Sequence, residues 1–210
     1  REKFKLLEKS GIDFAFFLKF NNSLRTMSPE NFISEILDSI NLKSFTVGDD
    51  FRFGLDRKGD TDQLREWGKK RGILVENTET ILYEDERVSS SRIRKALIGN
   101  NFKLAEKLLG RPYTFSGKVV HGQHLGRTID IPTANIWLPK QKLPIQGVYA
   151  VQCNLGEKTY YGIANMGVRP TVGGTNPVLE VHLFEFSEFI YSQRLKVRFI
   201  KKIRDEKKFE

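Results

Sequence analysis

The sequence predicts an α/β domain with a parallel sheet, followed by a small antiparallel β-barrel. Two observations carry this prediction. Up to Gly110, helical and strand-like segments alternate, which is typical of a parallel α/β sheet. Beyond Gly110, short segments of alternating polarity are separated by glycine and proline, which is typical of a small barrel. The length of 210 residues suits either two small domains or one large one.

The first half opens with an apolar helical face over residues 4–7, predicting a helix that ends at Gly11. The continuous apolar run over residues 14–20 predicts a strand that is buried on both sides. Ser28 and Pro29 predict the start of a second helix, because serine caps helices and proline suits their first turn. The expected buried stripe of this helix is Phe32, Ile33, Ile36, Leu37 and Ile40.

The rest of this half continues the alternation. A short strand is expected over residues 44–47, followed by the loop GDDFRFG. A helix is expected over residues 64–70 and a strand over residues 73–75. A last helix is expected to begin at Ser89 and to continue to residue 109.

In the second half, period-2 alternation predicts five short strands. They cover residues 118–121, 148–155, 160–164, 178–186 and 195–200. Gly156 and the pair Gly173-Gly174 are among the turn residues that separate them. Strands this short and this closely spaced favour an antiparallel barrel.

The net charge of +9 is unevenly distributed. Residues 1–110 carry 20 Lys/Arg against 18 Asp/Glu, whereas residues 111–210 carry 15 against 8. The basic second half indicates an anionic partner such as nucleotide phosphates, nucleic acid or an acidic surface. The only cysteine, Cys153, excludes an intrachain disulfide and favours a reducing, cytoplasmic location. No apolar run approaches the roughly 18 residues of a membrane span, so no membrane partner is expected.

The stretch GRTIDIPTANI contains the first candidate site. Pro132 favours extended backbone, in which Thr133 and Asn135 project to the same side. A hydroxyl and an amide oxygen suit Mg²⁺ that takes its other ligands from water and phosphates. Candidate phosphate-binding residues upstream are Gly122, Gly126 and Arg127. By spacing alone, a surface turn leading into an edge strand is the preferred interpretation, because no Walker-type Gly-Lys-Ser/Thr is present.

The stretch LEVHLFEF contains a candidate general base. Glu180 lies on the strand face opposite Leu179 and Val181. It suits a general base, but for an isolated glutamate the solvent face of a half-exposed strand is the preferred interpretation. The three histidines, His121, His124 and His182, have no metal-ligand spacing, so a metal site built from them is not expected.

The stretch VSSSRIRKAL offers serine hydroxyls at the positive end of a predicted helix. Arg92 and Arg94 would lie near this end, where cations are unfavourable unless an anion binds there. Two interpretations stay open: an anion site, or a capped helix with exposed basic residues.

Eight motifs now form one pattern: VGDDFRFG, VSSSRIRKAL, LLGRPY, GRTIDIPTANI, GVYAV, GIANMGVRPT, LEVHLFEF and IRDEKKF. They occur in the order seen in the bacterial bifunctional riboflavin kinase/FAD synthetase family, and they span essentially the whole chain. The chain therefore resembles this family. The resemblance implies a nucleotidyltransferase-like (Rossmann-like) domain over residues 1–110 that adenylylates FMN, and a riboflavin kinase-like barrel over residues 111–210.

The resemblance also implies roles for individual residues. In the kinase, Thr133 and Asn135 would serve Mg²⁺ and the phosphates of the co-substrate ATP, beneath the loop that contains Gly122, Gly126 and Arg127. Glu180 would be the general base, and Arg204 would lie on the flavin side. In the adenylyltransferase, the expected ATP contacts are Ser90, Ser91 and Arg94, and the expected flavin contacts are Asp50 and Arg52. Riboflavin, FMN, FAD and ATP are the expected partners.

The sequence departs from the family in three places. The family's adenylyltransferase begins with a strand and a G-x-F-D-G-x-H-x-G-H type ATP motif, which is not found in this sequence, so we expect this domain to be N-terminally incomplete. Asp130 stands where the family usually has glycine. The sequence stops at Glu210, before the helix that closes the family's kinase module.

Three alternative functions remain at this point. A monofunctional riboflavin kinase needs only the second half of the chain. A basic barrel that binds single-stranded nucleic acid accounts for the charge of the second half, but not for Glu180 or the PTAN stretch. A flavin-storage protein would bind flavin without turnover.

Overall fold

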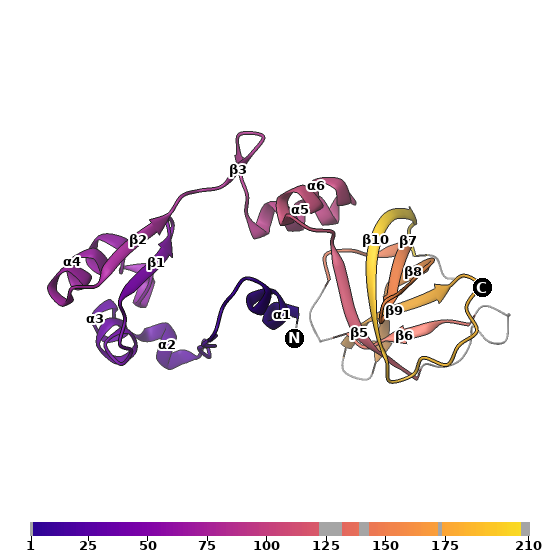
Figure 1. Cartoon of the computed structure of the whole chain (residues 1–210), viewed down its shortest axis with the longest axis horizontal. Helices are drawn as coiled ribbons and strands as arrows, with labels where there is room; N and C mark the ends of the chain where they lie inside the picture. The colour runs from indigo at the N-terminus through magenta and orange to yellow at the C-terminus, as the bar shows by residue number, and fades with distance from the viewer. Residues whose placement is uncertain (1, 122–131, 139–142, 172–173, 207–210) are drawn as a thin grey trace. The chain divides into compact units, whose positions relative to one another are not determined.

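The structure is a computed structural model that describes residues 2–121, 132–138, 143–171 and 174–206 (Figure 1). The chain forms two compact units, Arg1–Arg87 and Val88–Glu210. The division falls upstream of Gly110, because the two helices before Gly110 pack with the barrel. The domain boundary near Gly110 stays a prediction.

The first unit begins with three short helices: α1 (Glu2–Lys9), α2 (Asn22–Thr26) and α3 (Pro29–Phe32). The predicted start at Ser28 is confirmed, since its hydroxyl accepts a hydrogen bond from the Asn31 backbone N–H at 3.1 Å. A π-helical segment, η1 (Ile33–Leu37), follows α3 directly. Leu37 is buried as expected, whereas Ile40 lies exposed beyond the end of the helix.

The parallel sheet predicted for this unit is confirmed. Strand β1 (Ser44–Gly48) pairs in parallel with β2 (Leu74–Thr78). Helix α4 (Thr61–Arg71) connects them in the sequence, after the single turn η2 (Leu55–Arg57). The core consists of Leu37, Val47, Phe53, Leu64 and Trp67.

The strand predicted for residues 14–20 is wrong. These residues form no regular structure, and the exposed fractions of Phe14, Phe16 and Phe20 are 82%, 78% and 76%. Within the described residues no strand pairs with this segment, and a strand needs a neighbour for its backbone hydrogen bonds. A small hairpin that the sequence did not predict, β3 (Leu82–Tyr83) with β4 (Glu86–Arg87), ends the unit.

The second unit begins with two helices where the sequence predicted one. Helix α5 (Ser90–Ile98) ends at Gly99, and α6 (Phe102–Leu109) begins after Asn101. The prediction of a continuous helix is wrong because Asn100 adopts a left-handed conformation (φ 57°) and the Asn101 side chain caps α6.

The antiparallel barrel is confirmed, and it is closed (Figure 1). Its strands are β5 (Thr114–Val120), β6 (Ala134–Ile136), β7 (Gly147–Leu155), β8 (Lys158–Thr171), β9 (Gly174–Leu183) and β10 (Arg194–Arg204). They neighbour one another in the order β10-β5-β6-β9-β8-β7. This order places the short β6 between β5 and β9.

Helices α5 and α6 share one hydrophobic core with the barrel. The ring of Phe102 in α6 lies 5.7 Å from that of Tyr149 in β7 and 6.3 Å from that of Phe199 in β10, between ring centroids. Across the described part of the chain, no helix has the length and apolarity needed to cross a membrane.

Candidate functional site

A row of polar residues crosses three neighbouring strands of the barrel. Glu180 of β9 lies opposite Asn135 of β6 on one side and opposite Asn165 of β8 on the other. Its neighbours in sequence, Leu179 and Val181, are fully buried in the barrel, so Glu180 projects from the outer face. Side chains at directly opposed positions have Cβ atoms about 5 Å apart, which brings the carboxylate and both amides within reach of one ligand.

Thr133 comes one residue before β6 and two before Asn135. The extended backbone sends both side chains to the same side of the segment, and both residues are half-buried. The expected neighbourhood of Thr133, Asn135 and Glu180 therefore lies on one strand pair. Their catalytic and binding roles stay predictions.

Asn165 is a candidate that sequence reasoning missed. Its Oδ1 atom is buried and accepts no hydrogen bond from any group that the structure describes. A buried amide oxygen without a donor is costly, so it marks a position where a ligand or water supplies the missing donor. In the sequence, Asn165 is one residue of the motif GIANMGVRPT. Its place beside Glu180 depends on strand register, which the motif does not reveal.

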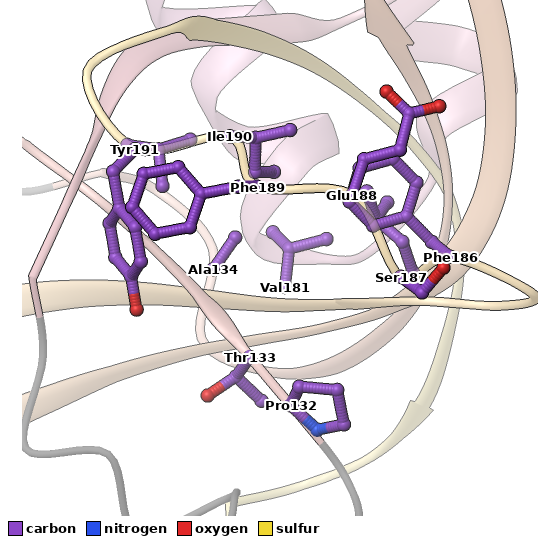
Figure 2. A pocket seen from close by; sticks show the side chains of 12 residues that line it. Pro132, Thr133, Ala134, Val181, Phe186, Ser187, Glu188, Phe189, Ile190 and Tyr191 are labelled. Atoms are coloured by element: carbon purple, nitrogen blue, oxygen red, sulfur yellow. The ribbon is translucent and has the colours of Figure 1, made fainter.

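A cavity of about 390 Å³ lies at the end of the barrel next to Thr133. Figure 2 shows Pro132 and Thr133 along one side, Ala134 and Val181 in the middle, and side chains from residues 186–191 along the opposite side. The last group belongs to the connection between β9 and β10. The run of aromatic residues in this connection is the sequence signal that could have predicted its place at a cavity.

The connection between β9 and β10 is held against β5. Val119 accepts a backbone hydrogen bond from Ser192 at 2.9 Å and donates one to Gln193 at 2.8 Å. The rings of His121 and Tyr191 stack with centroids 4.0 Å apart. These contacts make this side of the cavity part of the barrel.

The oxygen donors at this site fit Mg²⁺ bound together with phosphates. A hydroxyl from Thr133 and amide oxygens from Asn135 and Asn165 are hard ligands, and Glu180 adds a carboxylate. Within the described residues, no group of three or more His, Cys, Asp or Glu side chains is arranged to hold a metal. The Asn165 oxygen has no hydrogen-bond donor among the described residues, and the site offers few charged metal ligands. Both features suit an ion that keeps water and phosphate ligands.

Arg204 ends β10 and is exposed. Val148 of β7 pairs with Arg204 on one side and with Asn165 on the other, so Arg204 lies in register with Asn165 and Glu180, after a register shift between Lys202 and Arg204 and across the buried Val148. The Arg204 guanidinium donates a hydrogen bond to the Asp205 carbonyl at 3.0 Å. A second cavity, of about 770 Å³, lies beside this strand end and is lined by Lys202, Asp205 and Glu206 among others.

In the first unit, Asp50 and Arg52 lie in the loop after β1. Arg87 of β4 forms ion pairs with Asp49 at 2.9 Å and with Asp50 at 3.1 Å. Arg52 donates to the Phe51 carbonyl at 2.8 Å. A hydrogen bond from Thr80, together with the Arg87 charge, lowers the pKa of Asp49. These contacts tie the loop to the β3–β4 hairpin.

In the second unit, Ser89 caps α5, accepting a hydrogen bond from the Arg92 backbone N–H at 3.2 Å. Ser90, Ser91 and Arg94 follow in the first turns and are exposed. The helix cap is therefore present, and an anion role for this end stays a prediction. Three predicted phosphate-binding residues, Gly122, Gly126 and Arg127, lie outside the described residues, as do Asp130 and His124.

Comparison with known proteins agrees with this architecture. The riboflavin kinase family matches residues 109–210, and the FAD synthetase family matches residues 1–92. Together they define an FAD synthetase-type α/β part followed by a flavokinase barrel.

Whole-chain relatives identify the family. The chain is 44% identical to the bifunctional riboflavin kinase/FMN adenylyltransferase of Escherichia coli K12, covering 100% of this chain and 67% of that protein. The corresponding protein of Haemophilus influenzae is also 44% identical, with 100% and 68% covered. A crystal structure described as a macrolide-efflux protein from Streptococcus pneumoniae matches with a TM-score of 0.82 and 32% identity, covering 100% of this chain and 68% of that one. The chain belongs to the bifunctional riboflavin kinase/FMN adenylyltransferase family.

Proposed function

We propose that the barrel transfers the γ-phosphoryl group of ATP to riboflavin, giving FMN, and that the α/β part belongs to a module that adenylylates FMN to FAD. The carrying observation is that Glu180 lies directly opposite Asn135, which is two residues from Thr133 at the edge of the cavity. Phosphoryl transfer depends on positioning and charge neutralisation, plus one group that orients the attacking hydroxyl. Glu180 supplies the group that orients the hydroxyl, and Thr133 and Asn135 supply oxygen ligands for Mg²⁺, which would neutralise the phosphate charge.

The cavity next to Thr133 supports binding of the nucleotide base. Its apolar residues, Ala134, Val181 and Leu183, and the rings of residues 186–191 offer a surface for a flat, weakly polar ring. Thr133 at the cavity edge and Asn135 beside it would then hold the triphosphate, together with the loop that contains Gly122, Gly126 and Arg127. A magnesium ion bound there supplies neutralisation of phosphate charge.

Glu180 acts on the flavin substrate. Its carboxylate accepts the proton of the riboflavin 5′-hydroxyl as the oxygen bonds to the γ-phosphorus and the bond to ADP breaks. Asn135 and Asn165, on either side, orient the carboxylate and the hydroxyl. Arg204, in register with this row across Val148, supports flavin binding at its far end.

In the adenylyltransferase part, Ser90, Ser91 and Arg94 would contact ATP at the positive end of α5. Asp50 and Arg52 would contact flavin from the loop after β1.

One chromatographic experiment tests both halves. The protein is incubated with riboflavin and Mg-ATP, and riboflavin, FMN and FAD are separated over time. FMN is the expected product of the kinase, and FAD that appears after FMN is the expected product of the adenylyltransferase. Absence of FMN contradicts the kinase proposal, whereas FMN without FAD shows kinase activity alone and contradicts the adenylyltransferase proposal.

The family matches do not favour the alternatives of a monofunctional kinase or a nucleic acid-binding barrel. We expect neither nucleic acid nor a membrane as a partner. The buried free thiol of Cys153 supports a cytoplasmic location, which also stays a prediction.

A further inference from the structure

The backbone pairing that holds β6 to β9 stops just before the proposed ATP ligand. It covers Ala134–Ile136, opposite residues 179–181. One step further, Thr133 would lie opposite His182. Pro132 has no backbone N–H to extend the ladder, so this stretch needs another contact to fix its position.

His182 supplies that contact through its side chain. Its Nδ1 atom lies 2.9 Å from the carbonyl oxygen of Pro132, a residue fifty positions away in the sequence. A carbonyl oxygen only accepts, so Nδ1 must carry the hydrogen. The imidazole is also in edge-on contact with the Phe184 ring, with centroids 5.8 Å apart.

The hydrogen bond fixes the peptide group that joins Pro132 to Thr133, because the carbonyl oxygen and the Thr133 nitrogen lie in one plane. The position of the Thr133 hydroxyl at the cavity edge then depends on His182. Glu180 and His182 lie two residues apart on one face of β9, so one strand face carries both the proposed base and this contact.

We propose that His182 is a positioning residue of the kinase: its Nδ1–H···O=C bond to Pro132 holds Thr133 in place for Mg-ATP. The inference rests on the proposed kinase function and deepens it. His182 does not take the substrate proton, which goes to Glu180, so its loss changes nucleotide affinity more than the rate of the chemical step.

Two variants of matched size test the inference. His182→Asn places an amide N–H where Nδ1 stands, whereas His182→Leu fills similar space without a donor. Loss of one hydrogen bond that positions a ligand weakens binding about tenfold. We expect His182→Leu to raise the Mg-ATP KM and the Mg-ADP Kd about tenfold, while kcat stays within about threefold of wild type. For His182→Asn, we expect the KM, the Kd and kcat all to stay within about threefold of wild type.

A readout without nucleotide tests the hydrogen bond itself. Nitrogen-15 NMR of the ligand-free protein should show the His182 proton on Nδ1. A proton on Nε2 alone contradicts the inference, as does a His182→Leu variant with wild-type Mg-ADP affinity or a His182→Asn variant as weak as His182→Leu. If His182→Leu does not fold, as judged by circular dichroism, His182→Gln replaces it, since its longer side chain moves the amide away from the Nδ1 position.

The design separates this inference from the function on which it rests. A wild-type protein that forms no FMN and binds no Mg-ADP contradicts the proposed kinase function, and the role of His182 in nucleotide binding with it. An active wild type whose His182→Leu variant is unchanged contradicts the positioning role alone.

Discussion

At the scale of single residues, Glu180 has an environment set by its cross-strand neighbours. Two amides, from Asn135 and Asn165, lie opposite it on β6 and β8, and one of their oxygens is buried without a donor. The carboxylate of Glu180 therefore has an amide that can bind polar ligands on each side. An ordinary solvent-exposed glutamate would have water in these places.

The first prediction separates catalysis from binding at this row. Glu180→Gln removes the proton acceptor, so kcat should fall by about two orders of magnitude or more, while the Mg-ADP Kd measured by calorimetry stays within about threefold. Asn135→Ala and Thr133→Ala should instead weaken Mg-ADP binding. The exposed Glu157→Gln serves as the control for loss of one charge. A Glu180→Gln enzyme of near-normal rate removes Glu180 from the role of base.

The second prediction concerns the only thiol. Burial raises the pKa of Cys153 to about 12, from an ordinary value of 9.0. Above pH 9 the unfolded chain loses the thiol proton and the folded chain does not, so the free energy of unfolding falls as pH rises towards 12. Near pH 10 this contribution is on the order of 1 kcal/mol.

Urea unfolding at pH 8 and pH 10 measures this effect. Cys153→Ala should lose less stability than wild type between the two pH values, since it has no thiol to ionise. All other groups are common to both proteins and cancel in the difference. Equal losses would show that Cys153 ionises as readily in the folded protein as in the unfolded chain.

At the scale of elements, the strand pairs that carry the site depend on close backbone approach. Gly162 of β8 lies opposite Leu183, and a Cβ atom at this position would collide with the His182 carbonyl oxygen. Only glycine lets β8 and β9 pair at this spacing, and the same pair aligns Asn165 with Glu180.

The third prediction follows from this approach. Gly162→Ala should lower the free energy of unfolding by about 1–3 kcal/mol, because backbone must move to relieve the collision. Gly99→Ala is the matched control in the same unit: its added Cβ would lie 3.5 Å from the nearest atom, the Lys95 carbonyl oxygen. Urea denaturation of both variants gives the comparison, and equal stabilities would contradict the collision.

At the scale of the whole molecule, the helices that precede the barrel belong to its core. Phe102 packs on Tyr149 and Phe199, and Glu106 forms an ion pair with Arg198 at 3.3 Å. The stretch that contains Ser90, Ser91 and Arg94 is therefore part of the same compact unit as the kinase barrel, although the family resemblance assigns it to the adenylyltransferase.

The fourth prediction compares two fragments. Residues 88–210 should unfold in one cooperative transition, whereas residues 111–210 should be less stable by at least about 3 kcal/mol, the usual cost of losing one buried phenylalanine. Chemical denaturation of the two fragments measures the difference. Equal midpoints with equal slopes would show that α5 and α6 add nothing to the barrel.

Sequence patterns predicted elements well where the pattern is a property of the segment itself. Alternation of polarity found most barrel strands, and serine followed by proline found the start of α3. Prediction was wrong where structure depends on partners, as in the exposed run over residues 14–20. The helix break at Asn100 depends on a left-handed residue that hydrophobic spacing does not reveal.

By itself, the sequence determined the two-part architecture, the family, and the faces on which Thr133, Asn135 and Glu180 project. Only the tertiary structure decided that Asn165 completes the row beside Glu180, that residues 186–191 line the cavity, and that His182 contacts Pro132. The reason is that the side to which each side chain of a strand projects follows from local backbone geometry. Which residue lies opposite another is decided only when the strands pair and the barrel closes.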